Sequence, residues 1–227
     1  MRPYRGVEAA ERLAERRRRL LAAGLDLLGA EQQDISALTV RAVCRSAGLA
    51  SRYFYESFTD KEEFVAAVFD WVIAELAATT QAAVASVPAH EQARAGMANV
   101  VRTIADDASI GRLLFGTQLA DAVIVRKRAE SSALFAMLSG QHAIDVLRAP
   151  ANEAVNAAAH FVVGGVGQTI SAWLAGDVQL EPDQLVDLLA SLLNELADPN
   201  LVRPRVTETA AGATAAPRDP AATSASW

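Results

Sequence analysis

Cationic and aromatic side chains near the N-terminus have the clearest potential for chemistry, and that chemistry is contact with nucleic acid. Arg52 presents a planar guanidinium that can donate two parallel hydrogen bonds to a guanine edge, and Tyr53 presents an aromatic face suited to a thymine methyl group or a sugar. With Ser51 they are predicted to contact DNA; the alternative is an ordinary solvated pair. Thr39 and Arg41 are predicted to hold phosphates at a helix N-terminus, where backbone N–H groups attract anions.

Catalytic and metal-binding patterns are missing from the sequence. It has no nucleophile elbow, Walker loop, dinucleotide fingerprint or paired-carboxylate motif. His90, His142 and His160 are scattered, and none has an acidic neighbour at a metal-ligand spacing. Cys44 is the only cysteine, so we expect a buried apolar residue; a redox-sensing thiol is the alternative. We therefore expect a protein that is not an enzyme and that has no cofactor and no metal.

The charge is divided unevenly along the chain. Residues 1–52 contain ten Lys or Arg and six Asp or Glu, a balance of +4, whereas the remainder contains eleven and twenty-one, a balance of −10. This asymmetry favours an N-terminal part that faces a polyanion and a body that avoids one. The single cysteine and the lack of an apolar signal core behind the basic N-terminus predict a reducing, cytoplasmic location.

Long segments rich in alanine and leucine predict an all-α fold. Between Tyr4 and Glu181 the only prolines are Pro88 and Pro150, so these segments are much longer than an ordinary strand. The uncharged run Ala154–Gly176 contains several polar residues and four glycines, which favours a buried or interfacial helix over a membrane span. Helices are expected over residues 7–29, 39–47, 52–56, 60–85, 89–107, 109–115, 117–148, 152–175 and 182–197.

Two short helices position the candidate DNA-contacting side chains. Thr39 is a suitable N-cap for the first helix, Gly48 ends it, and Ser51 is expected to cap the second. A short turn with a glycine and an apolar residue, here Leu49, joins them, which is the helix-turn-helix pattern. The four arginines at 16–19 lie on the polar faces of the preceding helix, either as a solvated surface or as phosphate contacts.

The segment LTVRAVCRSAGLASRYFYESFTDKEEFVAAVFD, at residues 38–70, resembles the DNA-binding domain of the TetR family of bacterial transcriptional regulators. The resemblance covers roughly residues 15–75 and implies that Tyr55 and Lys61 contact the DNA backbone; the alternative for Lys61 is a pair with a carboxylate three or four residues away on the same helix. Gly24 differs from the family's usual alanine and allows a close approach of the neighbouring helix. Ser57 and Tyr53 also depart from the usual residue types, which puts a phosphate contact in question and predicts different base preferences.

The remainder of the chain is expected to form a helical bundle that dimerises and binds a ligand. The uncharged helix and the leucine-rich last helix each need a second partner, which a four-helix interface between two copies supplies. The residues predicted at this interface are Gly164, Gly165, Gly167, Leu185, Leu189, Leu192, Leu193 and Leu196. The family resemblance implies a ligand cavity, for which the candidate lining residues are Trp71, Phe115, Gln118, Phe135, Met137, His142, Phe161 and Trp173.

These observations together predict a ligand-responsive transcriptional regulator. We expect a basic arm at residues 1–6, a DNA-binding domain at 7–60, a ligand-binding and dimerisation domain at 61–198 and a disordered tail at 199–227. The preferred form is a homodimeric repressor that a small hydrophobic effector releases from a palindromic double-stranded operator, with no membrane partner. The alternatives are a helical-bundle binding protein or enzyme without a DNA role, and a TetR-like activator.

Overall fold

The computed structural model describes residues 4–31, 38–145, 149–198 and 201, and every regular element within these ranges is helical. The predicted all-α fold is confirmed. The predicted tail at 199–227 lies almost wholly outside the described residues, as do residues 1–3. The α-helices are α1 (Tyr4–Leu28), α2 (Val40–Ala47), α3 (Arg52–Tyr55), α4 (Lys61–Ala85), α5 (Gln92–Asp106), α6 (Ala108–Phe115), α7 (Ala122–Asp145), α8 (Glu153–Ala175) and α9 (Pro182–Leu196).

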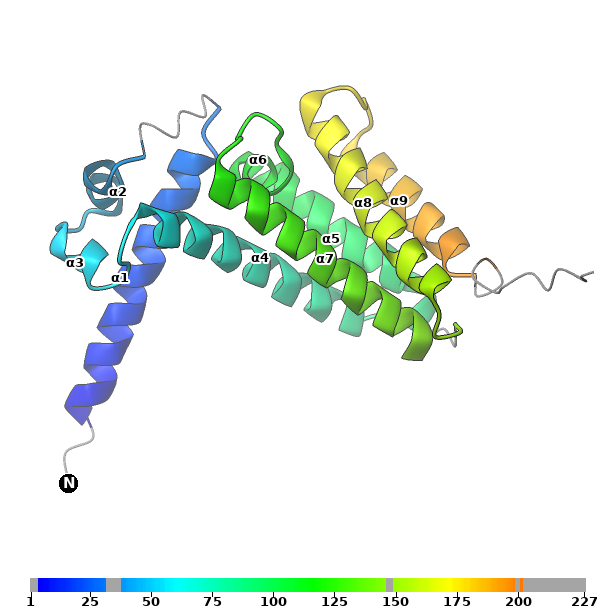
Figure 1. Ribbon diagram of the computed structural model, residues 1–227, viewed down its shortest axis with the longest axis horizontal. Helices are drawn as coiled ribbons and strands as arrows, with labels where there is room; N and C mark the ends of the chain where they lie inside the picture. Colours follow the sequence, from blue (N-terminus) through cyan, green and yellow to red (C-terminus); the bar gives the residue numbers. More distant parts are fainter. Residues whose placement is uncertain (1–3, 32–37, 146–148, 199–200, 202–227) are drawn as a thin grey trace, which may run out of the picture.

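Helices α1, α2 and α3 form a small unit at one end of the molecule, which we call the head (Figure 1). The caps of α2 are as predicted: the Thr39 side chain accepts a hydrogen bond from the Ala42 N–H, and Gly48 ends the helix in the left-handed conformation at φ 61°. Ser51 does not cap α3, because its own backbone is already helical and its side chain makes no capping bond. The turn from Gly48 to Ser51 gives the helix-turn-helix geometry.

Helix α4 connects the head to the rest of the chain, which we call the body. Its first turn is capped at Asp60, whose side chain accepts a hydrogen bond from the Glu63 N–H at 2.8 Å. The inward face of α4 is buried in a hydrophobic cluster that begins in α1 and continues into α6 and the start of α7. Head and body therefore share one continuous apolar core along α4.

A second hydrophobic cluster holds the body together at α5, α8 and α9. Val101 and Ile104 from α5, Ile170 from α8 and Leu185 from α9 are each at most 1% exposed. Helices α8 and α9 lie at the opposite end of the molecule from α2 and α3 (Figure 1). The body thus presents α8 and α9 far from the helix-turn-helix.

Three helix starts differ by three or more residues from the sequence-based expectation, and one of them is the start of α5, which begins at Gln92 because Ala89–Glu91 forms a 3-10 turn. Helix α1 begins at Tyr4, so residues 4–6 of the predicted arm belong to the helix. Helix α7 begins at Ala122 instead of 117, because the Asp121 side chain accepts hydrogen bonds from the Val123 and Ile124 N–H groups and so marks the N-terminus. Leu119 in the preceding loop is buried at 3% exposure, which explains why the pattern resembled a helix.

Candidate nucleic-acid interface

The predicted DNA-contacting residues come together on the head and on the start of α4. Thr39 and Arg41 lie at the N-terminus of α2, and Ser51, Arg52 and Tyr55 lie at α3; all five are exposed. Lys61 is the first residue of α4 and is also exposed, whereas Tyr53 is half-buried. These side chains therefore lie on three neighbouring elements at one end of the molecule (Figure 1).

A cluster of aromatic rings fixes α3 against α4. Phe54 is 1% exposed, and its ring centroid lies 5.4 Å from that of Phe58 and 5.2 Å from that of Phe64. The Phe58 and Phe64 rings meet edge to face at 5.0 Å. Such contacts between aromatic rings add to the energy of burial. Tyr55 is 64% exposed and touches Phe54 from outside, at a centroid distance of 5.5 Å.

Arginines of α1 brace the helix-turn-helix, a role that neither sequence interpretation of residues 16–19 foresaw. Arg19 donates a hydrogen bond to the Ala47 carbonyl, at the C-terminus of α2, over 2.6 Å. Arg17 donates to the Ser57 carbonyl over 2.7 Å, and its guanidinium lies 4.4 Å from the centre of the Phe58 ring. The helical spacing of the sequence predicted that these arginines lie on a polar face of α1, but it could not predict that they bind the carbonyls of Ala47 and Ser57.

Tyr53 has two guanidinium neighbours. Nη2 of Arg52 donates a hydrogen bond to the Tyr53 hydroxyl over 2.6 Å, and the Arg52 Cζ atom lies 4.6 Å from the ring centre. The Arg16 Cζ atom lies 4.3 Å from the same ring centre, and Arg16 Nη1 lies 3.5 Å from Glu56 Oε2. The bond from Arg52 and its positive charge lower the pKa of the Tyr53 hydroxyl.

Cys44 and Ser57 occupy the interior of the head. Burial raises the pKa of the Cys44 thiol, and a hydrogen bond with the Ser51 side chain opposes that rise. Cys44 is 3% exposed, so the structure favours a packing role for it. The Ser57 hydroxyl is buried and has no hydrogen-bond partner.

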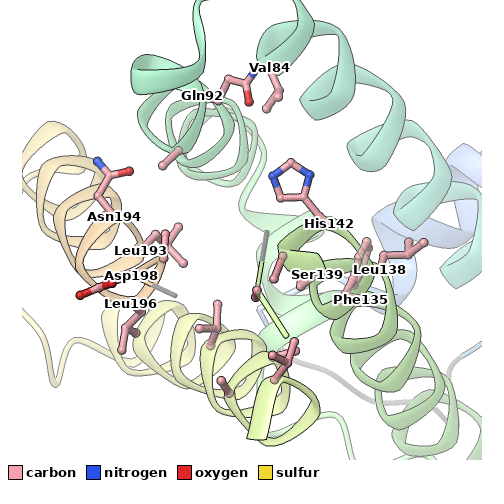
Figure 2. Close-up of a pocket in the computed structure, with 18 of the residues that line it drawn as sticks. Val84, Gln92, Phe135, Leu138, Ser139, His142, Leu193, Asn194, Leu196 and Asp198 are labelled. Atoms are coloured by element: carbon pink, nitrogen blue, oxygen red, sulfur yellow. The ribbon is translucent and has the colours of Figure 1, made fainter. Parts of the chain in front are cut away.

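A pocket of about 490 Å³ opens in the body at the end of the bundle away from the head. Val84 and Gln92 form one side, and Phe135, Ser139 and His142 of α7 line the wall beside them (Figure 2). Leu193, Asn194, Leu196 and Asp198 close the opposite side, and small residues of α8 form the floor (Figure 2). Its size lies within the roughly 300–1,000 Å³ typical of small-molecule sites.

Two of the eight predicted ligand residues line this pocket, Phe135 and His142. Trp71 and Phe115 pack against the hydrophobic clusters, and the Trp173 indole N–H donates to the Leu180 carbonyl over 2.8 Å. The other three predicted residues are exposed and lie away from the pocket: Gln118, Met137 and Phe161. Residue type alone did not separate packed aromatics from pocket walls.

The eight predicted dimer residues lie in three kinds of surroundings. Leu185 and Leu189 are at most 2% exposed inside their own bundle, so their assignment to a subunit interface is corrected: they hold α9 to α5. On the outer faces, Gly164 and Gly165 have nothing within 4 Å of an added Cβ, and Leu192 is 49% exposed. Of the remaining three, Gly167 lies against Phe115, Leu193 lines the pocket and Leu196 is 37% exposed.

Helix α6 joins the head to the body at a second place besides α4. Arg112 donates a hydrogen bond to the Gly29 carbonyl, just beyond the end of α1. An added Cβ at Gly29 would lie 2.5 Å from the Ser109 Cβ atom, so the two helices meet at a glycine. At the other end of α6, the half-buried Arg128 donates to the carbonyls of Arg112 and Leu113.

In the part of the chain that the structure describes, no three or more His, Cys, Asp or Glu side chains are grouped so that they could hold a metal ion. None of its helices is long and apolar enough to cross a membrane.

Comparison with known families supports the interpretation of the head. Residues 20–68 match the family model described as bacterial regulatory proteins, tetR family. This match contains α2 and α3, the turn between them, the second half of α1 and the first residues of α4. The suspected resemblance to the TetR family is confirmed. No curated protein sequence matches the chain significantly.

Solved structures share the fold of about four fifths of the chain. A TetR-family transcriptional regulator from Syntrophomonas wolfei has a TM-score of 0.64 at 14% identity, with 81% of this chain and 95% of that chain covered. The fatty acid degradation regulator FadR from Bacillus halodurans gives 0.61 at 14% identity, covering 78% and 94%. FadR from Bacillus subtilis, solved in complex with stearoyl-CoA, gives 0.57 at 17% identity, covering 80% and 97%.

Proposed function

We propose that this chain, a transcriptional regulator of the TetR family, is a homodimeric repressor that leaves a palindromic operator when a small apolar molecule occupies its body. The single observation that carries the proposal is the braced helix-turn-helix, with exposed Thr39, Arg41 and Arg52 on a head of net positive charge. The protein acts in the cytoplasm, where its DNA is, and it acts by binding and not by catalysis.

The head offers two kinds of DNA contact. Arg52 at the exposed edge of α3 is suited to a base edge in the major groove. Thr39 and Arg41 at the start of α2, Tyr55 and Lys61 are suited to phosphates. The Thr39 hydroxyl accepts the bond from the Ala42 N–H, and its own hydrogen is available to donate to a phosphate oxygen.

The test of the DNA role is a gel shift with duplex DNA flanking the gene, followed by selection of bound duplexes from a randomised pool. We expect a palindromic site with half-sites one helical turn apart, about 34–36 Å. The logarithm of affinity should fall with the logarithm of salt concentration at roughly −0.9 per phosphate contacted. Binding that does not depend on salt, or no binding to any duplex in dilute buffer, contradicts the proposal.

The dimer is proposed to form through the outer faces of α8 and α9. Phe161 on α8 is 68% exposed, Leu188 and Leu192 on α9 are 43% and 49% exposed, and Gly164 and Gly165 leave room for another helix. A monomer seldom exposes so many large apolar side chains on adjacent helices. A two-fold axis through this surface would relate the two heads, so that each head contacts one half-site of a palindromic operator.

The effector is proposed to occupy the pocket between α4, α5, α7, α8 and α9. Most of its lining residues are alanine, valine and leucine, and Gln92, Ser139, His142 and Asn194 supply hydrogen-bonding groups. This composition is typical of a site for a largely apolar molecule. Because the Bacillus subtilis FadR structure contains stearoyl-CoA, long-chain acyl compounds are the first effectors to test.

A pocket-filling variant tests the effector site. Ala143 on α7 is half-buried and lines the pocket, so Ala143→Phe should abolish release of the operator by stearoyl-CoA while operator binding persists. Ala133→Phe is the matched control, because Ala133 lies on the same helix but is exposed. Normal release from the Ala143→Phe variant would exclude this pocket, and no release from the wild type would exclude stearoyl-CoA as the effector.

The signal is proposed to reach the head through α4 and α6. The C-terminal part of α4 contributes Val84 to the pocket, and its N-terminal part packs in the core of the head. Helix α6 is bonded to the end of α1 through Arg112 and Gly29. An effector shifts the equilibrium between the DNA-bound and the released conformation only by its difference in affinity for the two. The released conformation, in which the spacing of the heads does not match the half-sites, must therefore bind the effector more tightly.

A further inference from the structure

The sequence predicted that Tyr53 contacts DNA itself, but its ring is already engaged within the head. The Arg52 guanidinium lies over the ring at 4.6 Å and the Arg16 guanidinium at 4.3 Å, both within the roughly 6 Å of a cation–π contact. The Tyr53 hydroxyl accepts the hydrogen bond from Arg52. A thymine methyl group that used the same ring would compete with these cations.

Arg16 is itself held on α1, so it fixes the ring from a neighbouring helix. Its Nε donates to the Arg12 carbonyl over 3.0 Å, and its Nη1 lies 3.5 Å from Oε2 of Glu56, the residue that follows α3. Only 27% of the Arg16 side chain is exposed, whereas Arg52, the other partner of the ring, is an exposed residue. The Tyr53 ring is therefore held from α1 by Arg16, and its other cationic partner, Arg52, is exposed to solvent.

Arg52 gains a defined direction from this contact. Neighbouring residues on a helix do not face each other, so Arg52 must fold back along the tyrosine ring to reach its hydroxyl. The guanidinium carries five N–H donors, of which the tyrosine uses one and a guanine edge uses two. A long side chain that is ordered before binding loses less conformational freedom when the complex forms.

We propose that Tyr53 is a positioning residue, which holds the Arg52 guanidinium in the orientation needed to contact a guanine and is itself held by Arg16. The proposal rests on the proposed DNA-binding function and deepens it, because it makes α1 a determinant of sequence preference. Arg52 makes the base contact, and Tyr53 acts through it. Replacing Tyr53 should therefore weaken discrimination at the same base pair that Arg52 recognises.

A double-mutant cycle on Tyr53 and Arg52 tests this arrangement. The probes are the duplex that the wild-type protein selects from a randomised pool and a set of single base-pair variants of it. Arg52→Ala should reduce discrimination at one guanine by about 5- to 100-fold. Tyr53→Phe, which keeps the ring and removes the hydroxyl, should reduce it at the same guanine by about two- to tenfold. In the Arg52→Ala background, Tyr53→Phe should have no further effect.

Two controls separate positioning from general damage. Tyr55→Phe removes the other hydroxyl of α3, which lies on an exposed ring, and should weaken binding to all probes equally. Arg16→Met should lower discrimination at the same guanine as Tyr53→Phe does. The melting temperatures of the Tyr53 and Tyr55 variants should equal that of the wild type, because neither hydroxyl is buried.

Three results would overturn the inference. Additive losses, or a Tyr53→Phe effect at a different base pair, would make Tyr53 a direct contact. Improved discrimination by Tyr53→Phe would mean that the tyrosine withholds Arg52 from the DNA. If the Tyr53→Phe variant discriminates between base pairs as well as the wild type does, the hydroxyl has no positioning role, and the proposed function stays intact. If the wild type binds no duplex, both the positioning role and the proposed function are overturned.

Discussion

Gly24 lies where α1 packs closely against α4, and a single hydrogen atom in place of a side chain permits that contact. A Cβ atom added there would lie 2.6 Å from Phe64 Cζ and 2.6 Å from Val68 Cγ2, both of which are buried. A glycine in the middle of a helix costs about 1 kcal/mol relative to alanine, so this position gives up helix stability for close packing. Arg17 and Arg19, which brace the head, likewise act through contacts with other segments and not within their own helix.

Gly24→Ala should therefore destabilise the protein despite the better helix former. Overpacking costs about 1–3 kcal/mol, and the gain in helix propensity is about 1 kcal/mol, so we expect a net loss of up to about 2 kcal/mol in the free energy of unfolding. Urea denaturation measures it. Val68→Ala makes room for the new methyl group, so Gly24→Ala should cost less in that background. A stabilised single variant would refute the close contact.

Glu63 should contribute to stability in a pH-dependent way. Its carboxylate accepts hydrogen bonds from the Thr59 hydroxyl at 2.6 Å and the Thr59 N–H at 2.7 Å, and these bonds lower its pKa. A lowered carboxyl pKa stabilises the folded state above the unfolded value of about 4.3, and the contribution is lost as the pH falls through the folded value.

Glu63→Gln should remove this contribution. The wild type should be the more stable protein at neutral pH, and the two free energies of unfolding should converge as the pH falls from about 5 toward 3. Urea denaturation across that range measures the difference. Asp60 stays unchanged and keeps the N-cap of α4 in both proteins. A constant difference down to the acid end would show that the carboxylate charge plays no part.

At the scale of helices, capping residues, glycines and prolines predicted most of the elements because those signals act within a few residues. Thr39, Gly48 and Asp60 end or begin helices as expected. The start of α7 was misplaced because the buried Leu119 continues a helical pattern through a loop. The pocket walls and the inward face of α9 depend on contacts between distant segments, and periodicity alone carries no information about those. The DNA-contacting residues stay predictions, although the structure gathers them on the head.

Arg128 shows how one helix depends on another. Its guanidinium donates to the carbonyls of Arg112, Leu113 and Leu119 at 2.7 to 3.3 Å, and burial lowers its pKa. Arg128→Met removes this donor and leaves the Arg112 carbonyl only its bond from the Gly116 N–H, so we expect a loss of about 1–3 kcal/mol in the free energy of unfolding, measured by urea denaturation. Arg126→Met is the matched control on the same helix.

Arg126 is exposed and its Nε lies 3.6 Å from the Glu130 carboxylate, so its replacement should change stability by less than about 1 kcal/mol. Arg128→Lys should fall between the two, because one ammonium group cannot reach three carbonyls in the geometry of a guanidinium. Equal stability of the Arg126 and Arg128 variants would show that water satisfies the end of α6.

At the scale of the whole molecule, the separation of the head from α8 and α9 makes the outer surface of α9 the place to test assembly. Leu188→Asp with Leu192→Asp should yield a monomer in sedimentation velocity, because two charges would be buried at the proposed subunit interface. Operator affinity should fall by about a hundredfold or more, since two linked heads bind far more tightly than one.

The control for the dimer is a leucine of similar exposure elsewhere on the body. Leu134 on α7 is 47% exposed, compared with 43% for Leu188 and 49% for Leu192. Leu134→Asp should leave both the sedimentation coefficient and the operator affinity unchanged. A doubly substituted α9 that remains dimeric would place the interface on another surface.

The apolar core that runs without a break from α1 through α4 to α6 and α7 limits how such regulators can be recombined. A chimaera joined at Asp60 would remove Phe64, Val65 and Val68 from the partners that cover them, leaving both halves with uncovered apolar surface. A graft that transfers the DNA-binding preference of this head to the body of another regulator must include α4. The α6 helix of that regulator must also supply a donor for the Gly29 carbonyl, as Arg112 does here. Exchange of DNA-binding domains between such regulators is therefore expected to succeed when the exchanged segment includes α4, and to fail when the chains are joined in the loop between α3 and α4.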